Sequence, residues 1–211
     1  MRKPPITICV LSDTHNQHRK LKIPKCDILV FAGDAGITTY DRLEDFNDWV
    51  GKQPARHKIV VAGNHDLYAE QIGKNDTKLL LSNAIYLENE SVQVEGIRFW
   101  GSPYSVLFNG WGFMKPSDKL KQIWDLIPEK TNIVVTHGPA FGILDYVRDL
   151  CQGCPELRSK IDEIKPKYHL NGHIHECNGV LQREFTTHIN ASILDERYQI
   201  AHEPILFEYK V

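Results

Sequence analysis

The sequence predicts an α/β fold in which short buried strands alternate with amphipathic helices. Five short segments are apolar almost without interruption, which is typical of strands buried on both faces of a sheet. Segments with the apolar spacing of helices lie between them. Since a typical domain has about 150 residues, the 211 residues of the chain predict a single domain, residues 1–211, built from layers of helix and sheet.

The strands and helices are expected in a definite order. Strands are expected at residues 6–11, 27–31, 58–61, 132–136 and 167–170, where β-branched and other apolar residues are concentrated. Helices are expected over residues 40–50, 118–126 and 155–164. Pro155 fits the start of the last helix because the first helical turn does not use the N–H that proline lacks.

Two further regions predict hairpins that extend or double the sheet. Between residues 84 and 101, apolar and polar residues alternate around the turn-forming pair Glu95–Gly96. Residues 179–209 are again rich in strand-forming residues separated by turns.

The charge balance excludes some classes of partner. The chain has 25 Lys and Arg against 27 Asp and Glu, a formal net charge of −2, whereas proteins that bind nucleic acids or anionic membranes carry a basic excess. No apolar run approaches the roughly 20 residues that span a bilayer. We therefore expect neither a nucleic-acid nor a membrane partner.

The cysteines indicate a reducing compartment. They are odd in number and scattered along the chain, which suits reduced thiols in a cytoplasmic protein better than a disulfide framework. Cys151 and Cys154 have the spacing of a redox or zinc pair, but no second pair accompanies them, so we expect two reduced thiols. The five are Cys9, Cys26, Cys151, Cys154 and Cys177.

Each of the five predicted strands is followed within a few residues by side chains that can bind metals. In open α/β sheets, ligands bind outside the carboxyl ends of the strands, so these clusters are expected to converge on one crevice. The clusters are Asp13–Thr14–His15, Gly33–Asp34, Gly63–Asn64–His65–Asp66, His137–Gly138 and Gly172–His173–Ile174–His175.

The converging side chains form a candidate site for two metal ions. Seven ligands are too many for one tetrahedral zinc and suit two ions that share a carboxylate, with Asp34 as the expected bridge. Imidazole, carboxylate and amide ligands without thiolate favour Mn, Fe, Co, Ni or Zn over Mg or Ca, and we expect manganese first. The ligands are Asp13, His15, Asp34, Asn64, His137, His173 and His175.

The charge of such a site indicates an anionic substrate. Two divalent ions bring +4 and two carboxylates return −2, which leaves about +2 for a phosphate ester to balance. Water held between two ions about 3.5 to 4 Å apart loses its proton near neutral pH and becomes the nucleophile. His65 is the candidate general acid for the leaving group, with Asp66 as its orienter. The expected catalytic residues are His65, Asp34, Asn64 and Asp66.

The five clusters, in this order, resemble the signature motifs of the calcineurin-like metallophosphoesterases. Further segments resemble its small metallophosphoesterase-domain-containing branch over nearly the whole chain; they are Trp100–Gly101–Ser102–Pro103, Gly110–Trp111–Gly112–Phe113, residues 124–128 and Gly172–His173–Ile174–His175–Glu176. The resemblance implies a four-layer α/β/β/α sandwich and hydrolysis of phosphodiesters, including cyclic nucleotides. It also implies that Asp13, His15, Asp34 and His175 hold one ion, and that Asp34, Asn64, His137 and His173 hold the other.

One departure from the superfamily pattern bears on the substrate. The protein phosphatases of this superfamily carry a longer Gly-Asp-x-x-Asp-Arg block, whereas Gly33–Asp34 is followed here by Ala35–Gly36–Ile37. The arginine that would clamp a phosphomonoester dianion is therefore missing, and we expect a small diester as the substrate. A phosphomonoesterase, a nuclease and a catalytically silent interaction module are the alternatives, and the oligomeric state is left open.

A cluster of aromatic residues has two interpretations. Trp100, Tyr104, Phe108, Trp111 and Phe113 could stack on a nucleobase at the rim of the site or pack as a loop that closes the two sheets. Trp111 and Phe113 are the expected substrate contacts because glycines flank them. The histidines outside the motifs, His18, His57, His169, His188 and His202, are expected to be structural or exposed.

Overall fold

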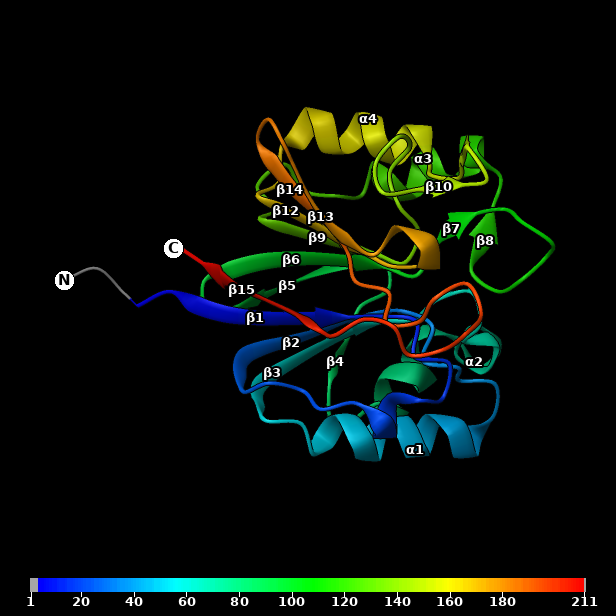
Figure 1. Cartoon of the computed structure of the whole chain (residues 1–211), viewed down its shortest axis with the longest axis vertical. Helices are drawn as coiled ribbons and strands as arrows, with labels where there is room; N and C mark the ends of the chain where they lie inside the picture. The colour runs from blue at the N-terminus through cyan, green and yellow to red at the C-terminus, as the bar shows by residue number, and fades with distance from the viewer. Residues whose placement is uncertain (1–3, 211) are drawn as a thin grey trace.

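Two mixed sheets lie face to face, with a pair of helices covering the outer side of each (Figure 1). The computed structural model describes residues 4–210. Helices α1 and α2 cover one sheet, and α3 and α4 cover the other. The expected four-layer α/β/β/α sandwich is confirmed. The helices are α1 (Tyr40–Gly51), α2 (Leu67–Leu80), α3 (Ser117–Trp124) and α4 (Pro155–Ile164).

The first sheet has the strand order β15-β1-β2-β3-β4, in which β1 to β4 run parallel and β15 is antiparallel to β1. Its strands are β1 (Ile6–Leu11), β2 (Cys26–Ala32), β3 (Ala55–Val61), β4 (Ile85–Tyr86) and β15 (Ile205–Tyr209).

The second sheet has the order β13-β14-β12-β9-β6-β5, with a parallel centre and an antiparallel strand at each edge. Its strands are β5 (Glu90–Val94), β6 (Ile97–Ser102), β9 (Ile133–Thr136), β12 (Tyr168–Asn171), β13 (Gly179–Arg183) and β14 (Thr186–Asn190). The short strands β7 (Ser105–Val106), β8 (Met114–Lys115), β10 (Tyr146–Val147) and β11 (Leu150–Cys151) form two small ribbons.

The central strands are apolar throughout because each contributes to two cores. Along β1, Ile8 and Val10 point into the core between the sheets, whereas Cys9 and Leu11 point into the core beneath α1 and α2. Successive side chains of a strand face opposite ways, so a strand buried on both faces cannot alternate with polar residues. A third core joins α3 and α4 to the second sheet.

The expected strands and three expected helices are confirmed, whereas α2 was not predicted. This helix is broken at Gly73, whose φ is 81°, and only Ala69 and Thr77 are buried along it. Its apolar spacing is therefore too weak to stand out in the sequence. The hairpin turn between β5 and β6 is as expected, with φ of 52° at Glu95 and 81° at Gly96.

Two further expectations concern the cysteines and the membrane. All five cysteines are free thiols, and the Sγ of Cys154 accepts the indole N–H of Trp124 at 3.3 Å. Among the helices of residues 4–210, none combines the length and apolar character that a bilayer crossing requires.

Candidate metal centre

The loops that follow β1, β2, β3, β9 and β12 meet at one edge of the two sheets. Backbone hydrogen bonds tie them together: the Asp13 N–H donates to the carbonyl of Gly33 at 2.9 Å, and the His65 N–H donates to Oδ1 of Asp34 at 2.8 Å. The His173 N–H donates to the Asp13 carboxylate at 3.0 and 3.1 Å, which joins the second sheet to the first. The predicted convergence is therefore present.

Strained backbone and glycines allow these loops to approach one another. Three of these residues have φ in the left-handed region that residues other than glycine rarely adopt: 55° at Asp13, 59° at Asp34 and 71° at His173. A Cβ at Gly63 would collide with the carboxylate of Asp34, and one at Gly172 with that of Asp13. The glycines before the ligands are thus required by close packing around the carboxylates.

Around His137, three lone pairs converge. Its Nδ1 lies 3.0 Å from the carbonyl of Ala32, to which it can only donate. In the neutral ring, Nε2 then carries the lone pair, and it lies 2.9 Å from Oδ1 of Asn64 and 3.3 Å from Oδ1 of Asp34. An imidazole nitrogen, an amide oxygen and a carboxylate oxygen directed at one point suit a divalent metal ion. The ring of His173 packs 4.9 Å from that of His137.

A second convergence lies on the other side of Asp34. The Nδ1 of His175 donates to the carbonyl of Asp195 at 2.9 Å, which leaves Nε2 free at 3.6 Å from Oδ1 of Asp13. The Nε2 of His15 is buried and has no hydrogen-bond partner among the described residues, and it lies 3.6 Å from Oδ2 of Asp34. A buried nitrogen without a partner is costly unless an ion or ligand satisfies it. Both sites therefore fit metal ions, with one carboxyl oxygen of Asp34 facing each.

The electrostatics keep the two carboxylates charged. Burial alone would raise the pKa of Asp34, but the neighbouring His137 and His15 lower it well below its usual range. Burial would also raise the pKa of Asp13, but His175 and His137 have the larger combined effect, and its pKa is lowered. Burial would lower the pKa of His137, but the charge and hydrogen bond of Asp34 raise it to about 9, so a metal ion must displace the proton from Nε2 before it uses that lone pair.

Asp66 has a role different from the expected one. Its carboxylate is buried and accepts backbone N–H groups of Gly63 and Ile37 at 2.8 Å, together with those of Asp34 at 3.0 Å and Gly36 at 2.8 Å. The expectation that Asp66 orients His65 is therefore corrected, because its two oxygens hold the loops after β2 and β3 together. Burial and the charge of Asp34 raise the pKa of Asp66 to about 6, against the opposing effect of these N–H groups.

A pocket of about 280 Å³ opens over the metal-ligand cluster. The indole of Trp111 forms part of its wall and lies 4.2 Å from the His65 ring, and its contact with substrate stays a prediction. The expectation for Phe113 is corrected: its ring is buried against Tyr104 at 5.7 Å, in the core beneath α2. The lining residues are His15, Asp34, Asn64, His65, Phe108, Trp111, Met114, His173, His175, Glu176, Glu196 and Tyr198.

Four of these lining residues were not predicted. The ring of Tyr198 lies 4.9 Å from that of His15 and 5.1 Å from that of His175. Met114, Glu176 and Glu196 complete the wall. Glu176 directly follows a ligand motif, which could have drawn attention to it, whereas Glu196 and Tyr198 lie in a long loop without any motif.

Comparisons with known proteins agree with this geometry. The family model described as calcineurin-like phosphoesterase matches residues 6–177. The human metallophosphoesterase domain-containing protein 1 is 37% identical, over 95% of this chain and 70% of that protein. A UPF0046 protein of Caenorhabditis elegans is 34% identical, over 97% of this chain and 75% of that protein. Among solved structures, the phosphopantetheinyl hydrolase of Mycobacterium tuberculosis superposes with a TM-score of 0.62 at 15% identity, covering 91% of this chain and 90% of that one, which shows a shared fold.

Proposed function

Because the chain belongs to the calcineurin-like phosphoesterase family, we propose that this metal-dependent phosphoesterase hydrolyses small, nucleotide-like phosphodiesters, with cyclic nucleotides among the candidates. The composition of the pocket carries this proposal. None of the described residues that line it is Lys or Arg. A phosphodiester has one negative charge to neutralise, whereas a monoester has up to two, so the bound ions suffice more readily for the diester.

The walls of the pocket suit an organic group larger than phosphate. Phe108, Trp111 and Met114 supply apolar surface, and Trp111 is 42% exposed, so its ring is available for stacking. Base stacking on an aromatic ring is tolerant of base identity. This wall supports a nucleotide-like substrate over a bare alkyl diester.

The chain's own residues would act as follows. Two divalent ions, with manganese favoured, would polarise the phosphate and activate water when bound. Asp13, His15, Asp34 and His175 would hold one ion and Asp34, Asn64, His137 and His173 the other. His65 would give the leaving oxygen its proton. In support of this role, Asp34 fixes its backbone, and its ring lies between those of Trp111 and His15, 4.7 Å from the latter.

Metal removal and restoration tests the proposal. The protein would be stripped with EDTA and titrated separately with Mn, Fe, Ni, Zn and Mg, using an aryl phosphodiester and the matching monoester. We expect a transition metal, manganese above all, to restore diester hydrolysis at a kcat/KM at least about tenfold above that for the monoester, a difference of about 1.4 kcal/mol. Preference for the monoester would favour a phosphomonoesterase, and preference for an oligonucleotide, assayed as a third substrate, would favour a nuclease. Absence of both metal binding and hydrolysis would favour an interaction module.

His65→Ala should slow hydrolysis most when the leaving group needs a proton. General acid catalysis contributes about 10²-fold or more, so we expect a loss of about 10²-fold with an alkoxide leaving group and a much smaller loss with a nitrophenolate. The same measurements on His57→Ala, which removes a half-buried histidine paired with Glu95 outside the pocket lining, serve as the control. Equal losses for both leaving groups would contradict proton donation by His65.

Trp111→Ala should weaken binding of nucleotide-like diesters. Stacking on an aromatic ring contributes about 1–3 kcal/mol, so KM should rise about tenfold while kcat changes little. Leu107→Ala, which truncates an exposed neighbour outside the pocket lining, is the control. An unchanged KM would show that the substrate does not contact this wall.

A further inference from the structure

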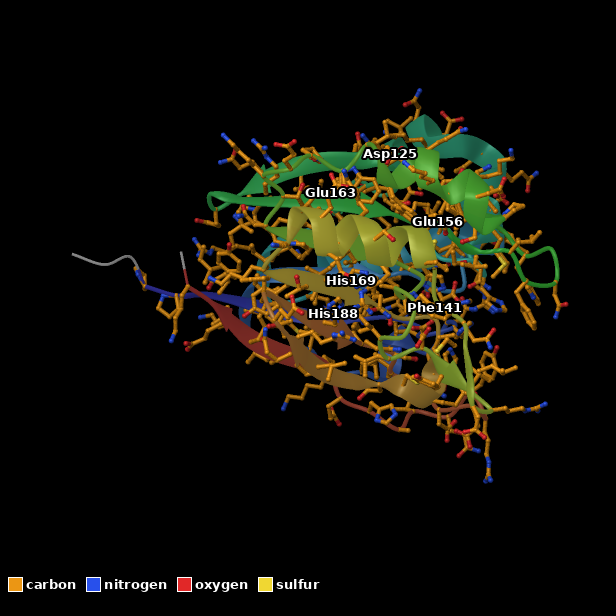
Figure 2. All side chains as sticks on the ribbon, turned by 90° about the horizontal axis from the view of Figure 1, so that it is seen from above. Asp125, Phe141, Glu156, Glu163, His169 and His188 are labelled. Atoms are coloured by element: carbon orange, nitrogen blue, oxygen red, sulfur yellow. The ribbon has the colours of Figure 1, made fainter. Side chains whose placement is uncertain are left out.

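A second cavity, of about 160 Å³, lies between α4 and the hairpin of β13 and β14. It contains none of the candidate metal ligands. Helix α4 contributes Arg158, and Lys165 directly follows its last residue. The hairpin contributes Arg183 and Phe185, and His188 of β14 forms part of the wall. Figure 2 shows His188 and its neighbour His169 side by side next to α4.

The charges around this cavity favour an anion. Of its five charged side chains, three are cationic and two are the carboxylates of Asp162 and Glu184. Asp162 is already paired with Nε of Arg158 at 2.7 Å. Within residues 4–210, the guanidinium of Arg183 makes no ion pair, and the ammonium of Lys165 lies 4.7 Å over the ring of Phe185 without one. Two cations and the carboxylate of Glu184 therefore remain outside ion pairs among the described residues, which leaves the cavity a net charge of about +1.

A chain of hydrogen bonds determines which nitrogen of His188 carries its proton. The hydroxyl of Thr136 lies 2.6 Å from the carbonyl of Gly138, which can only accept, so the hydroxyl proton is used there. The Nε2 of His169, 2.8 Å from the same hydroxyl oxygen, must then donate to it. Burial, followed by the proximity of His188, lowers the pKa of His169 well below its usual value, so the ring is neutral and its Nδ1 is an acceptor.

The Nδ1 of His188 must supply that acceptor with a proton. The two Nδ1 atoms are 3.2 Å apart, and His169 has no second proton to offer. Burial and the charge of Arg158 lower the pKa of His188 to about 4, so this ring is neutral as well. Its Nε2 therefore carries a bare lone pair. The side chain is 1% exposed and lines the cavity, and Nε2 has no hydrogen-bond partner within residues 4–210.

We propose that this cavity is a binding site for a small oxyanion that also carries a hydroxyl group, namely hydrogen phosphate. Its charged oxygens pair with the cations of Arg183 and Lys165, and its P–OH donates to the lone pair of His188. A hydrogen-bond acceptor on the wall of a cavity with a positive net charge suits neither a metal ion nor an anion without a proton to donate. This site is independent of the metal centre and of the proposed phosphodiesterase activity.

Anion titration of metal-stripped protein tests the proposal. Metal-free protein is used because the metal centre would also bind phosphate. Inorganic phosphate at pH 7.5 keeps one hydroxyl, whereas sulfate and the methyl phosphate dianion have a similar shape without one. We expect calorimetry to show phosphate binding at least about tenfold more tightly than sulfate or methyl phosphate. Phosphate alone should shift the Nε2 resonance of His188 in nitrogen-15 spectra.

Arg183→Ala should weaken phosphate binding about tenfold, because it removes an exposed cation and leaves the core intact. Arg148→Ala, an exposed arginine outside the cavity lining, should leave binding unchanged. Equal affinity for phosphate and sulfate, or phosphate binding that Arg183→Ala does not alter, would overturn the proposal. So would phosphate binding that leaves the His188 resonance in place.

Discussion

Asp34→Asn is expected to abolish turnover while leaving the chain folded. One carboxyl oxygen of Asp34 lies 3.3 Å from Nε2 of His137 and the other lies 3.6 Å from Nε2 of His15. Asparagine keeps an oxygen for the N–H of His65 but presents an amide, with no charge and no lone pair, to one of the two ion positions. Because the shared carboxylate faces both ion positions, we expect kcat/KM to fall by at least about 10²–10³-fold, which corresponds to about 3–4 kcal/mol of lost transition-state stabilisation.

Three measurements together check this expectation. Elemental analysis should find less than the full complement of metal in the variant, diester hydrolysis should be lost, and circular dichroism should match the parent protein. Asp76→Asn changes an exposed aspartate on α2 and serves as the matched control. Full metal content together with normal hydrolysis in Asp34→Asn would contradict the assignment of Asp34 as the shared ligand.

The sequence predicted most of the ligand cluster because each ligand follows a strand that is itself easily recognised. The position of Asp34 relative to β2, or of His137 relative to β9, depends only on where a short apolar strand ends. Parallel strands bring their carboxyl ends to one edge, so local patterns were sufficient to bring distant residues together.

Features that depend on the direction of a single side chain were not predictable in this way. Phe113 has a φ of 48°, and its N–H donates to Glu70 of α2 at 2.8 Å, which turns its ring into the core while Trp111 remains at the pocket. That contact requires α2, and the break at Gly73 interrupts the apolar spacing from which this helix could have been predicted. Asp66 was misassigned for a related reason, since three of the four N–H groups named above belong to the loop after β2, which is distant in sequence.

Asp66→Asn is expected to destabilise the whole protein more than any other single change at the site. Both oxygens of the carboxylate are engaged, Oδ2 by the N–H groups of Asp34 and Gly63 and Oδ1 by those of Gly36 and Ile37. Asparagine replaces one oxygen by an NH₂ group that faces two N–H donors and can accept from neither. Each buried donor left without a partner costs about 1–3 kcal/mol, so the free energy of unfolding should fall by about 3 kcal/mol.

Thermal and denaturant unfolding of the metal-free protein would measure this loss. The measurement is made at pH 7.5 because Asp66, with a pKa of about 6, is ionised there. For a chain of this length, about 3 kcal/mol corresponds to a melting temperature roughly 6–12 °C lower. Asp125→Asn, which affects only an exposed pair with Lys121, should change it by about 1 °C or less. A normal melting temperature in Asp66→Asn would mean that the two N–H groups left without an acceptor find other partners. The same carboxylate joins the loops that carry Asp34 and Asn64, so the variant should also bind metal more weakly. Weaker metal binding would distinguish loss of the hydrogen bonds between these loops from destabilisation of the core alone.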